Sequence, residues 1–527
     1  MSANPMLSPL LWTLVALQIA MGGFDVIVHH ELTERLAWKP NAGRELKLHA
    51  WRNVFYAVLF ASFAVMRPTG FVAGVLIALM AVEIVITLWD FVEEDMTRKL
   101  PPSERCLHTL LAINYGAILA LIGPEIVRWA ALPSGIERAD YGPGSVILIL
   151  ASAGVALFAL RDFYTSRRAF RLGAVPEAAI GDILGERRHI LVTGGTGFVG
   201  SALVVSLVKS GHDVTVLTRS VAHAGHLATP VRLVTSLDAV AAGERFDAIV
   251  NLAGAPIAGW LWTKAYRREI VASRLRTIDA LRRLIARLET KPAVVIGASA
   301  VGFYGDCGDE ILTEADGRGA KTTFSQRSCA IVERGMGTLA APGVRIVNLR
   351  IGLVLGRDGG LLGRMLPAFD LALGGPIGSG QQWMIWIALP DLVQLIAFAI
   401  ANPELDGAVN ATAPVPVCNR DFAAALGHAL GRPAILPLPA LPLRMALGDF
   451  AVELLLTGQR VLPAKAEAAG FRFTYREIGP ALAAAAGRGE GGTCISPSAG
   501  QSSTSRPWRP SRRSAGNQAQ HLPRSGP

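Results

Sequence analysis

The chain has 527 residues, of which 51% are hydrophobic and only 17% charged, so it is too long for one small domain and unusually apolar for a purely soluble protein. Its net charge of +10 does not indicate nucleic-acid binding, because the basic residues cluster beside apolar segments and in the C-terminal tail. The five cysteines lack the spacing of a metal site or a disulfide framework, which indicates a reducing compartment for the main domain.

Five apolar segments in the first third of the chain predict membrane-spanning helices. Their approximate limits are 7–28, 51–66, 70–89, 107–127 and 143–160, and three of them have the length of about 20 residues that crosses a bilayer. The first lacks the basic start and cleavage site of a signal peptide, so we interpret it as an anchor. Basic residues follow segments one, three and five, which predicts an inner or plasma membrane protein with its N-terminus outside and the region after the fifth segment in the cytoplasm.

Acidic residues and histidines repeat between these segments. Glu45 and His49 recur as Glu104 and His108 with the same spacing, and residues four apart share one helix face. Two interpretations stay open: a metal centre like those that carboxylates and imidazoles build inside helix bundles, or solvated helix ends with interfacial ion pairs. The residues concerned are His30, Glu31, Glu45, His49, Glu94, Asp95, Glu104 and His108.

Residues 189–220 have the pattern strand, glycine turn, helix and second strand. Gly194, Gly197 and Gly200 follow one another at intervals of three residues. Glycines with this spacing allow a tight turn and close approach to a pyrophosphate, and the helix N-terminus that follows attracts phosphate. The pattern therefore predicts a dinucleotide site. Its expected contact residues are Thr193, Gly194, Gly195, Thr196, Gly197, Phe198, Val199 and Gly200.

Two further strand ends are expected to complete the cofactor site. The second strand ends at Thr218, Arg219 and Ser220, where an arginine suits the 2′-phosphate of NADP, although a solvated arginine is the alternative. A later strand leads into small residues that allow the cofactor to lie close. These are Asn251, Leu252, Ala253 and Gly254.

Strands and helices alternate after a linker over 166–187, which predicts an α/β fold with a doubly wound parallel sheet. Together with the glycine turn, several later motifs resemble the short-chain dehydrogenase/reductase superfamily, in its atypical NADP-dependent epimerase-like branch that is often described as sugar nucleotide epimerase-related. The resemblance covers about 189–485 and implies a Rossmann-like NADP(H) domain with a small C-terminal substrate lobe. The motifs that carry it are 254–257, 262–263, 273–274, 297–305, 349–356, 374–383, 454–463 and 470–473.

The catalytic residues that this resemblance implies are altered. The superfamily pairs a serine with Tyr-x-x-x-Lys, and Ser299 stands at the expected strand end, but Cys329 and Glu333 occupy the Tyr and Lys positions. A glutamate can hydrogen-bond the cofactor ribose, yet it cannot lower the pKa of a phenol as a cation does.

Substitute roles can be assigned to the residues nearby. We expect Ser299 to orient the substrate, Tyr304 to act as proton donor unless it is a packed aromatic, and Arg350 to hold substrate or cofactor. Cys329 is either an acid/base or a small buried residue.

Three functions follow from these features. The first is a membrane-anchored NADP(H)-dependent oxidoreductase or epimerase that acts on a small-molecule substrate at the cytoplasmic face of a lipid bilayer. The others are a reductase partner of a metal centre in the membrane and an NADPH-binding redox sensor without turnover. A homo-oligomer is compatible with each.

The expected domain organisation has five parts. They are an all-α transmembrane domain over 1–165, a linker over 166–187, the NADP-binding Rossmann-like domain over 188–349, the substrate-side lobe over 350–486 and a disordered basic tail over 487–527.

Overall fold

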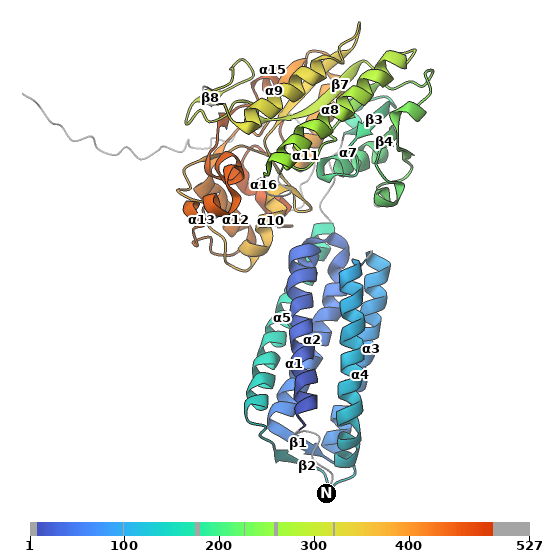
Figure 1. The fold of residues 1–527 in the computed structure, drawn as a ribbon, viewed down its shortest axis with the longest axis vertical. Coiled ribbons are helices and arrows are strands. Elements are labelled where there is room, and N and C mark those ends of the chain that lie inside the picture. Colours follow the sequence, from blue (N-terminus) through green and yellow to red (C-terminus); the bar gives the residue numbers. More distant parts are fainter. Residues whose placement is uncertain are drawn as a thin grey trace, which may run out of the picture. The chain divides into compact units, whose positions relative to one another are not determined.

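The computed structural model describes residues 8–98, 100–173, 180–225, 227–257, 262–319 and 322–488 of the chain. One region consists of long helices, and another is built around a parallel β-sheet (Figure 1). The tail that the sequence predicts to be disordered lies outside the described residues from position 489 onward.

Five helices among the described residues are long and apolar enough to cross a membrane. Long runs of Leu, Ile, Val and Ala favour this form in lipid, because a helix satisfies its backbone hydrogen-bonding groups internally. The helices are α1 (Pro9–Phe24), α2 (Gly43–Val65), α3 (Phe71–Thr97), α4 (Pro102–Ala130) and α5 (Pro143–Gly173).

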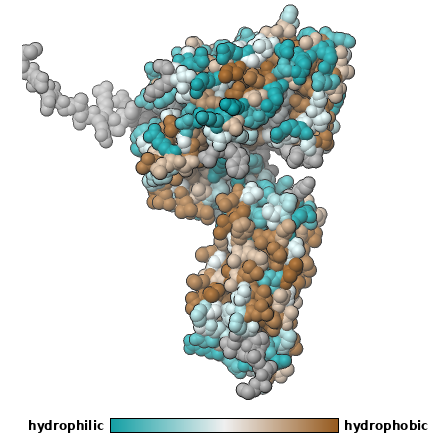
Figure 2. Space-filling model, in the orientation of Figure 1, coloured by the Kyte–Doolittle hydropathy of each residue, from teal (hydrophilic) through white to brown (hydrophobic). Residues whose placement is uncertain are grey.

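Large apolar side chains cover the outer surface of these helices. Val85, Leu88, Leu157 and Leu160 are each 60% exposed or more, and Figure 2 shows hydrophobic surface over much of this region. Exposed apolar area of this extent is typical of a surface that contacts lipid or another apolar partner. The predicted helical region with about five helices of spanning length is confirmed.

The helices extend beyond the expected apolar limits, and α5 reaches Gly173, inside the segment 166–187 that the sequence assigns to a linker. Helix α2 begins at Gly43 instead of near residue 51, because Glu45 and His49 are buried inside the bundle and lower the local hydropathy without ending the helix. Helix α1 continues into a π-helical stretch, η2 (Asp25–Thr33). The short elements here are η3 (Leu36–Trp38), η4 (Pro40–Ala42) and the antiparallel pair β1 (Met66–Thr69) and β2 (Gly135–Arg138).

Seven parallel strands form the central sheet of the second region, in the order β13-β9-β7-β6-β3-β4-β5. The strand order reverses between β3 and β6, and in sheets of this kind ligands bind at such a switch point. The strands are β3 (His189–Thr193), β4 (Asp213–Leu217), β5 (Arg232–Val234), β6 (Ala248–Asn251), β7 (Val294–Ala300), β9 (Arg345–Ile351) and β13 (Gly407–Ala411).

Helices cover both faces of this sheet, because successive strand residues point to opposite sides. Ile190 and Val192 contribute to the core beneath α7 (Phe198–Lys209) and α11 (Leu389–Ala401). Leu191 contributes to the core on the other face, beneath α8 (Lys264–Arg287) and α9 (Phe324–Gly337). The predicted doubly wound α/β fold is confirmed. Its edge strand β13 and helix α11 come from the segment that the sequence assigns to the C-terminal lobe.

A second core packs around Trp386 and Phe422, both fully buried, and supports the C-terminal elements. The helices α10 (Gly360–Asp370), α12 (Asn419–Leu430) and α16 (Ile478–Ala485) contribute to this core. Helix α15 (Ala464–Ala468) packs instead on the core of the sheet, and α13 (Ala440–Leu447) has no buried residue. Three strand pairs flank them: β10 (Leu353–Leu355) with β12 (Trp386–Ala388), β11 (Trp383–Met384) with β14 (Val417–Cys418), and β8 (Ile311–Leu312) with β15 (Arg460–Val461). The remaining short helices are α6 (Gly181–Leu184), η5 (Val221–Ala224), η6 (Leu237–Ala239), η7 (Val301–Phe303), α14 (Asp449–Ala451) and η8 (Val452–Leu456).

Candidate functional site: a dinucleotide turn and a serine–glutamate–arginine network

The glycine turn joins β3 to α7 with very little space. Gly194 adopts a φ of +73°, which a side chain rarely tolerates, and a Cβ at Gly200 would lie 2.2 Å from the Gly194 carbonyl oxygen. Within the described residues, no side chain caps α7 at Gly197, so its first N–H groups are free to bind an anion. The turn therefore has the geometry of a phosphate site.

The other predicted cofactor residues lie at the same edge of the sheet. Register pairs Thr193 with Leu217 on one side and with Asn251 on the other, so Thr218–Ser220 and Asn251–Gly254 flank the turn. Thr193 Oγ1 donates a 2.6 Å hydrogen bond to Asn251 Oδ1 across the switch point. Arg219 is exposed at the end of β4. The structure thus brings the predicted cofactor residues together.

A cavity of about 570 Å³ opens beside the turn. Its lining includes the turn segment 196–198, the segment 355–358 after β10 and Tyr475. A volume of this size is typical of a small-molecule pocket. The predicted catalytic residues are absent from its lining, so the cavity adjoins the cofactor turn and does not include Ser299 or Glu333.

Ser299, Glu333 and Arg350 form one hydrogen-bonded network on three neighbouring elements. Ser299 and Arg350 are register partners on β7 and β9, and Glu333 projects from α9. Ser299 Oγ donates to Glu333 Oε1 at 2.7 Å. The Arg350 guanidinium donates to both carboxylate oxygens, at 3.0 and 2.9 Å. Glu333, which replaces the lysine of the superfamily, is thereby fixed beside the serine.

Tyr304 is fully buried, and its hydroxyl has three close partners. It lies 2.9 Å from the Thr313 carbonyl oxygen and 2.8 Å from Asn410 Oδ1, and it accepts a hydrogen bond from Arg350 at 3.0 Å. Burial raises the pKa of the Tyr304 hydroxyl above its usual value, although the charge and hydrogen bond of Arg350 oppose this shift. The proton-donor role predicted for Tyr304 does not fit this environment, and the packed-aromatic alternative does.

Cys329 lies inside the protein next to the same network. Burial, and then the negative charge of Glu333, raise the pKa of the Cys329 thiol to about 11. A thiol with this pKa is almost entirely protonated near neutral pH, so an acid/base role for Cys329 does not fit either. Ser299 and Glu333 are therefore the predicted catalytic groups that the structure leaves partly accessible.

Two residues that organise this network escaped the sequence reasoning. Asn410 binds the Tyr304 hydroxyl from the edge strand β13, 106 residues away. Glu453 accepts hydrogen bonds from the Phe324 and Ser325 backbone N–H groups and so caps α9 together with the Thr323 side chain. The capping pattern at 323–326 is readable in the sequence, whereas no local signal marks Asn410 or Glu453.

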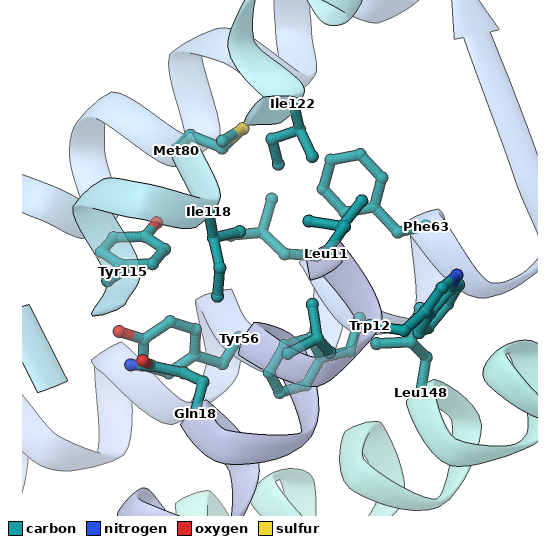
Figure 3. Close-up of a pocket in the computed structure, with 13 residues that line it drawn as sticks. Leu11, Trp12, Gln18, Tyr56, Phe63, Met80, Tyr115, Ile118, Ile122 and Leu148 are labelled. Carbon is teal, nitrogen blue, oxygen red and sulfur yellow. The ribbon is translucent and has the colours of Figure 1, made fainter. Parts of the chain in front are cut away.

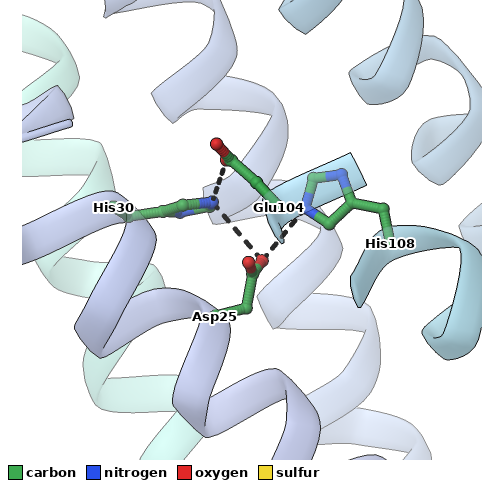
Figure 4. A group of neighbouring side chains, drawn as sticks. All are labelled: Asp25, His30, Glu104 and His108. Atoms are coloured by element: carbon green, nitrogen blue, oxygen red, sulfur yellow. Dashed lines mark hydrogen bonds and ion pairs between the residues drawn. The ribbon is translucent and has the colours of Figure 1, made fainter. Parts of the chain in front are cut away.

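The acidic and histidine residues of the helical region divide into two groups. Glu31 pairs with Arg161 at 2.6 Å and the exposed Asp95 with Arg105 at 2.8 Å, whereas Glu45 shares Arg98 with Glu104 of the second group. His30, Glu104 and His108 instead gather around Asp25 (Figure 4), which the sequence analysis did not select. His49 and Glu94 lie next to this group, and Asp90 contacts His49 at 3.1 Å.

An apolar cavity of about 80 Å³ lies among the same helices (Figure 3). Gln18, Tyr56 and Tyr115 line it with aliphatic and aromatic side chains, and the Tyr115 hydroxyl donates to Glu83 at 2.7 Å. Gln18 precedes Asp25 by seven positions, which is about 10 Å along a helix. Tyr56 follows His49, and Tyr115 follows His108, by the same number of positions. The cavity is thus about two helical turns from the cluster.

The sheet, glycine turn and strand-end serine define a dinucleotide-binding protein of the short-chain dehydrogenase/reductase class. Residues 190–411 match the NAD dependent epimerase/dehydratase family, and residues 438–485 match a domain of unknown function, DUF1731. The chain belongs to this epimerase family, among proteins of the SDR39U1 type. The five long helices lie outside both matched ranges.

Relatives in bacteria and mammals are similar to the second region. The Mycobacterium bovis epimerase family protein Mb2239 is 39% identical over 294 residues, which cover 56% of this chain and 96% of the relative. The Bos taurus SDR39U1 protein is 39% identical over 300 residues, which cover 56% of this chain and 98% of the relative. Human SDR39U1 (isoform 2), whose crystal structure was determined with NADPH, has 34% sequence identity to this chain. The two structures align with a TM-score of 0.52 over 56% of this chain and 99% of the human chain.

The substitution Gly200→Ala should strongly weaken NADPH binding, because the added methyl group would push α7 away from the turn. Losing about 3 kcal/mol of charged hydrogen bonding to the phosphates corresponds to about a 100-fold loss of affinity. Fluorescence titration of the purified full chain with NADPH measures this. Gly479→Ala, where a methyl group meets nothing within 4 Å, serves as control. Unchanged affinity in Gly200→Ala would contradict the assigned turn.

The substitution Tyr304→Phe should lower stability and leave cofactor affinity unchanged. It leaves buried partners of the hydroxyl unsatisfied, at a cost of about 1–3 kcal/mol. Thermal unfolding and NADPH titration of the same preparation separate the two effects. A loss of turnover with unchanged stability would instead support the proton-donor role.

Proposed function

We propose that the protein is a membrane-anchored NADP(H)-dependent oxidoreductase or epimerase that acts on a small molecule at the cytoplasmic membrane face. The observation that carries the proposal is the hydrogen bond from Ser299 to Glu333 at the carboxyl end of β7. Strand β7 is separated from the glycine turn of β3 by β6 alone, so cofactor and serine share one edge of the sheet. Family membership supports a NAD(P)-dependent reaction.

Two observations favour NADP(H) over NAD(H) as the cofactor. The exposed Arg219 follows β4, where a cation suits a 2′-phosphate and an acid suits the free ribose hydroxyl. The human relative, which is 34% identical, was crystallised with NADPH. We therefore assign the phosphate to Arg219 and the pyrophosphate to the turn from Thr193 to Gly200, with Asn251–Gly254 along the cofactor.

The network provides a route for a proton without a tyrosine–lysine pair. When bound, the nicotinamide would supply or accept the hydride. When a substrate hydroxyl is oxidised, its proton can pass to Ser299 Oγ while Ser299 passes its own proton to Glu333, 2.7 Å away. When a carbonyl is reduced, both transfers run in the opposite direction, from Glu333 through Ser299 to the substrate oxygen. Arg350 holds both oxygens of Glu333 and stabilises its ionised form, which leaves the carboxylate ready to accept the Ser299 proton.

The membrane placement rests on the five long helices and on the charges between them. Basic residues follow the first, third and fifth of these helices, so we propose that these ends face the cytoplasm. An odd number of spans then puts the N-terminus outside and the sheet region on the cytoplasmic side. In this proposal residues 1–165 form the anchor, and 188–486 form the enzyme.

A sensor without turnover is the second candidate. Tyr304 is fully engaged and Cys329 stays protonated, so two of the expected acid/base groups are unavailable for proton transfer. Tight NADPH binding without oxidation of the cofactor by any carbonyl substrate would favour the sensor over the enzyme.

The substitution Ser299→Ala should lower kcat for NADPH oxidation by about 100-fold or more, the contribution typical of acid–base groups. NADPH affinity should stay unchanged, because the phosphate contacts lie on other elements. Activity is measured on the full chain against aldehydes, ketones and nucleotide sugars. Ser236→Ala, a change in an exposed loop, is the control. Full activity of Ser299→Ala would reject this site.

The substitution Arg219→Ala should weaken NADPH binding by about 10- to 100-fold, the loss of one charged contact to phosphate. Affinity for NADH should hardly change, since NADH lacks the 2′-phosphate. Titrations with both cofactors measure the ratio, and Arg268→Ala, exposed on α8, controls for net charge. Equal losses for the two cofactors would show that Arg219 does not read the phosphate.

A further inference from the structure

We propose that Asp25, His30, Glu104 and His108 bind a divalent first-row transition-metal ion inside the helical bundle (Figure 4). One donor atom from each lies within 4.8 Å of the others. Asp25 and His30 come from η2, and Glu104 and His108 come from α4. The site is separate from the NADP(H) site and does not depend on it.

The distances between these donor atoms fit a shared metal ion. Asp25 Oδ2 lies 3.1 Å from His108 Nε2 and 3.5 Å from His30 Nε2, and Glu104 Oε1 lies 3.7 Å from His30 Nε2. Ligands bound tetrahedrally at about 2.0–2.2 Å are separated by roughly 3.3–3.6 Å. Both longer separations exceed ordinary hydrogen-bond lengths; the one of 3.5 Å falls within the range expected around one ion, and the one of 3.7 Å lies just above it.

His30 provides an independent observation. Its Nε2 atom is buried and has no hydrogen-bond partner among the described residues, and only 5% of the residue is exposed. A buried polar atom without a partner is costly and needs an explanation. Figure 4 shows this nitrogen directed toward Asp25 and Glu104, where a metal ion would satisfy it.

Neighbouring residues hold the ligands as the outer contacts of metal sites do. His29 Nδ1 lies 2.8 Å from Asp25 Oδ1, which leaves Oδ2 directed to the centre. Glu94 Oε2 lies 3.4 Å from His108 Nδ1, so His108 can present Nε2. Arg98 donates to both oxygens of Glu104. A carboxylate behind a ligating histidine fixes its tautomer and its orientation.

The charges of the cluster also favour a cation. Asp25, Glu45, Asp90, Glu94 and Glu104 are buried carboxylates. Among the described residues, Arg52 and Arg98 are the two guanidinium groups that contact them, so three of these negative charges lack a guanidinium partner there when the histidines are neutral. Uncompensated charge is expensive inside a membrane bundle, and a divalent ion removes most of it.

The donor types indicate which metal class fits. Two imidazoles and two carboxylates suit Zn²⁺, Fe²⁺ or Mn²⁺, whereas Ca²⁺ and Mg²⁺ prefer oxygen ligands alone. The π-helical hydrogen bonding of η2 runs between residues five apart, the spacing of Asp25 and His30. This local geometry places both side chains on one face of the helix.

Co²⁺ is a direct probe, because its visible absorption reports the ligand geometry. The purified full chain, treated with chelator and titrated with Co²⁺ in detergent, should bind about one ion per chain, as expected for a four-ligand site. His30→Ala and Asp25→Asn should each lower Co²⁺ affinity at least about 100-fold, and Glu94→Gln about 10-fold. Element analysis of the protein as purified should find iron, manganese or zinc.

Asp95→Asn and Glu31→Gln are the matched controls, because these carboxylates pair with Arg105 and Arg161 outside the cluster. Both should bind Co²⁺ as the wild type does. Size-exclusion chromatography and NADPH titration verify that each variant is folded. Failure of the wild type to bind Co²⁺ saturably would overturn the proposal, whatever the variants do. Binding that His30→Ala leaves unchanged would overturn it as well.

Discussion

The paired contact between Glu333 and Arg350 holds the candidate catalytic edge together. A charge largely removed from water is stable only when it is paired and hydrogen-bonded, and removing one partner leaves the other charge uncompensated. Here the pair joins α9 to β9, and it fixes the partner of Ser299. Arg350 also stacks 3.4 Å from the Phe303 ring centroid and contacts Tyr304. The position of the serine hydroxyl therefore depends on one ion pair.

Buried charges also have to be paired in the helical region, but there the arginines pair with only part of them. Arg52 and Arg98 neutralise part of the charge of a group of buried carboxylates. Among the described residues, the Nε2 atom of His30, which lies in this group, has no hydrogen-bond partner. Since the surroundings are apolar helices, the remaining charge has to be balanced by protons or by a metal ion. The bundle thus has a polar centre that anchoring alone does not require.

The two regions carry different sites. The family domain matches almost the whole length of relatives such as the Bos taurus protein, so its cofactor site is built without the five helices. The helices add a hydrophobic surface, a small apolar cavity and the histidine–carboxylate cluster.

Local sequence determined the features whose residues are neighbours along the chain. The turn from Gly194 to Gly200, the alternating strands and the apolar helices are all set by short-range geometry and solvation, and they were predictable for that reason. The repeat of Glu45 and His49 as Glu104 and His108 likewise indicated where polar groups gather. Tertiary packing decided the rest, because it sets burial and pairs residues far apart. It encloses Tyr304 with Asn410, and it brings Asp25 to His108 while Glu31 and Asp95 pair with arginines elsewhere.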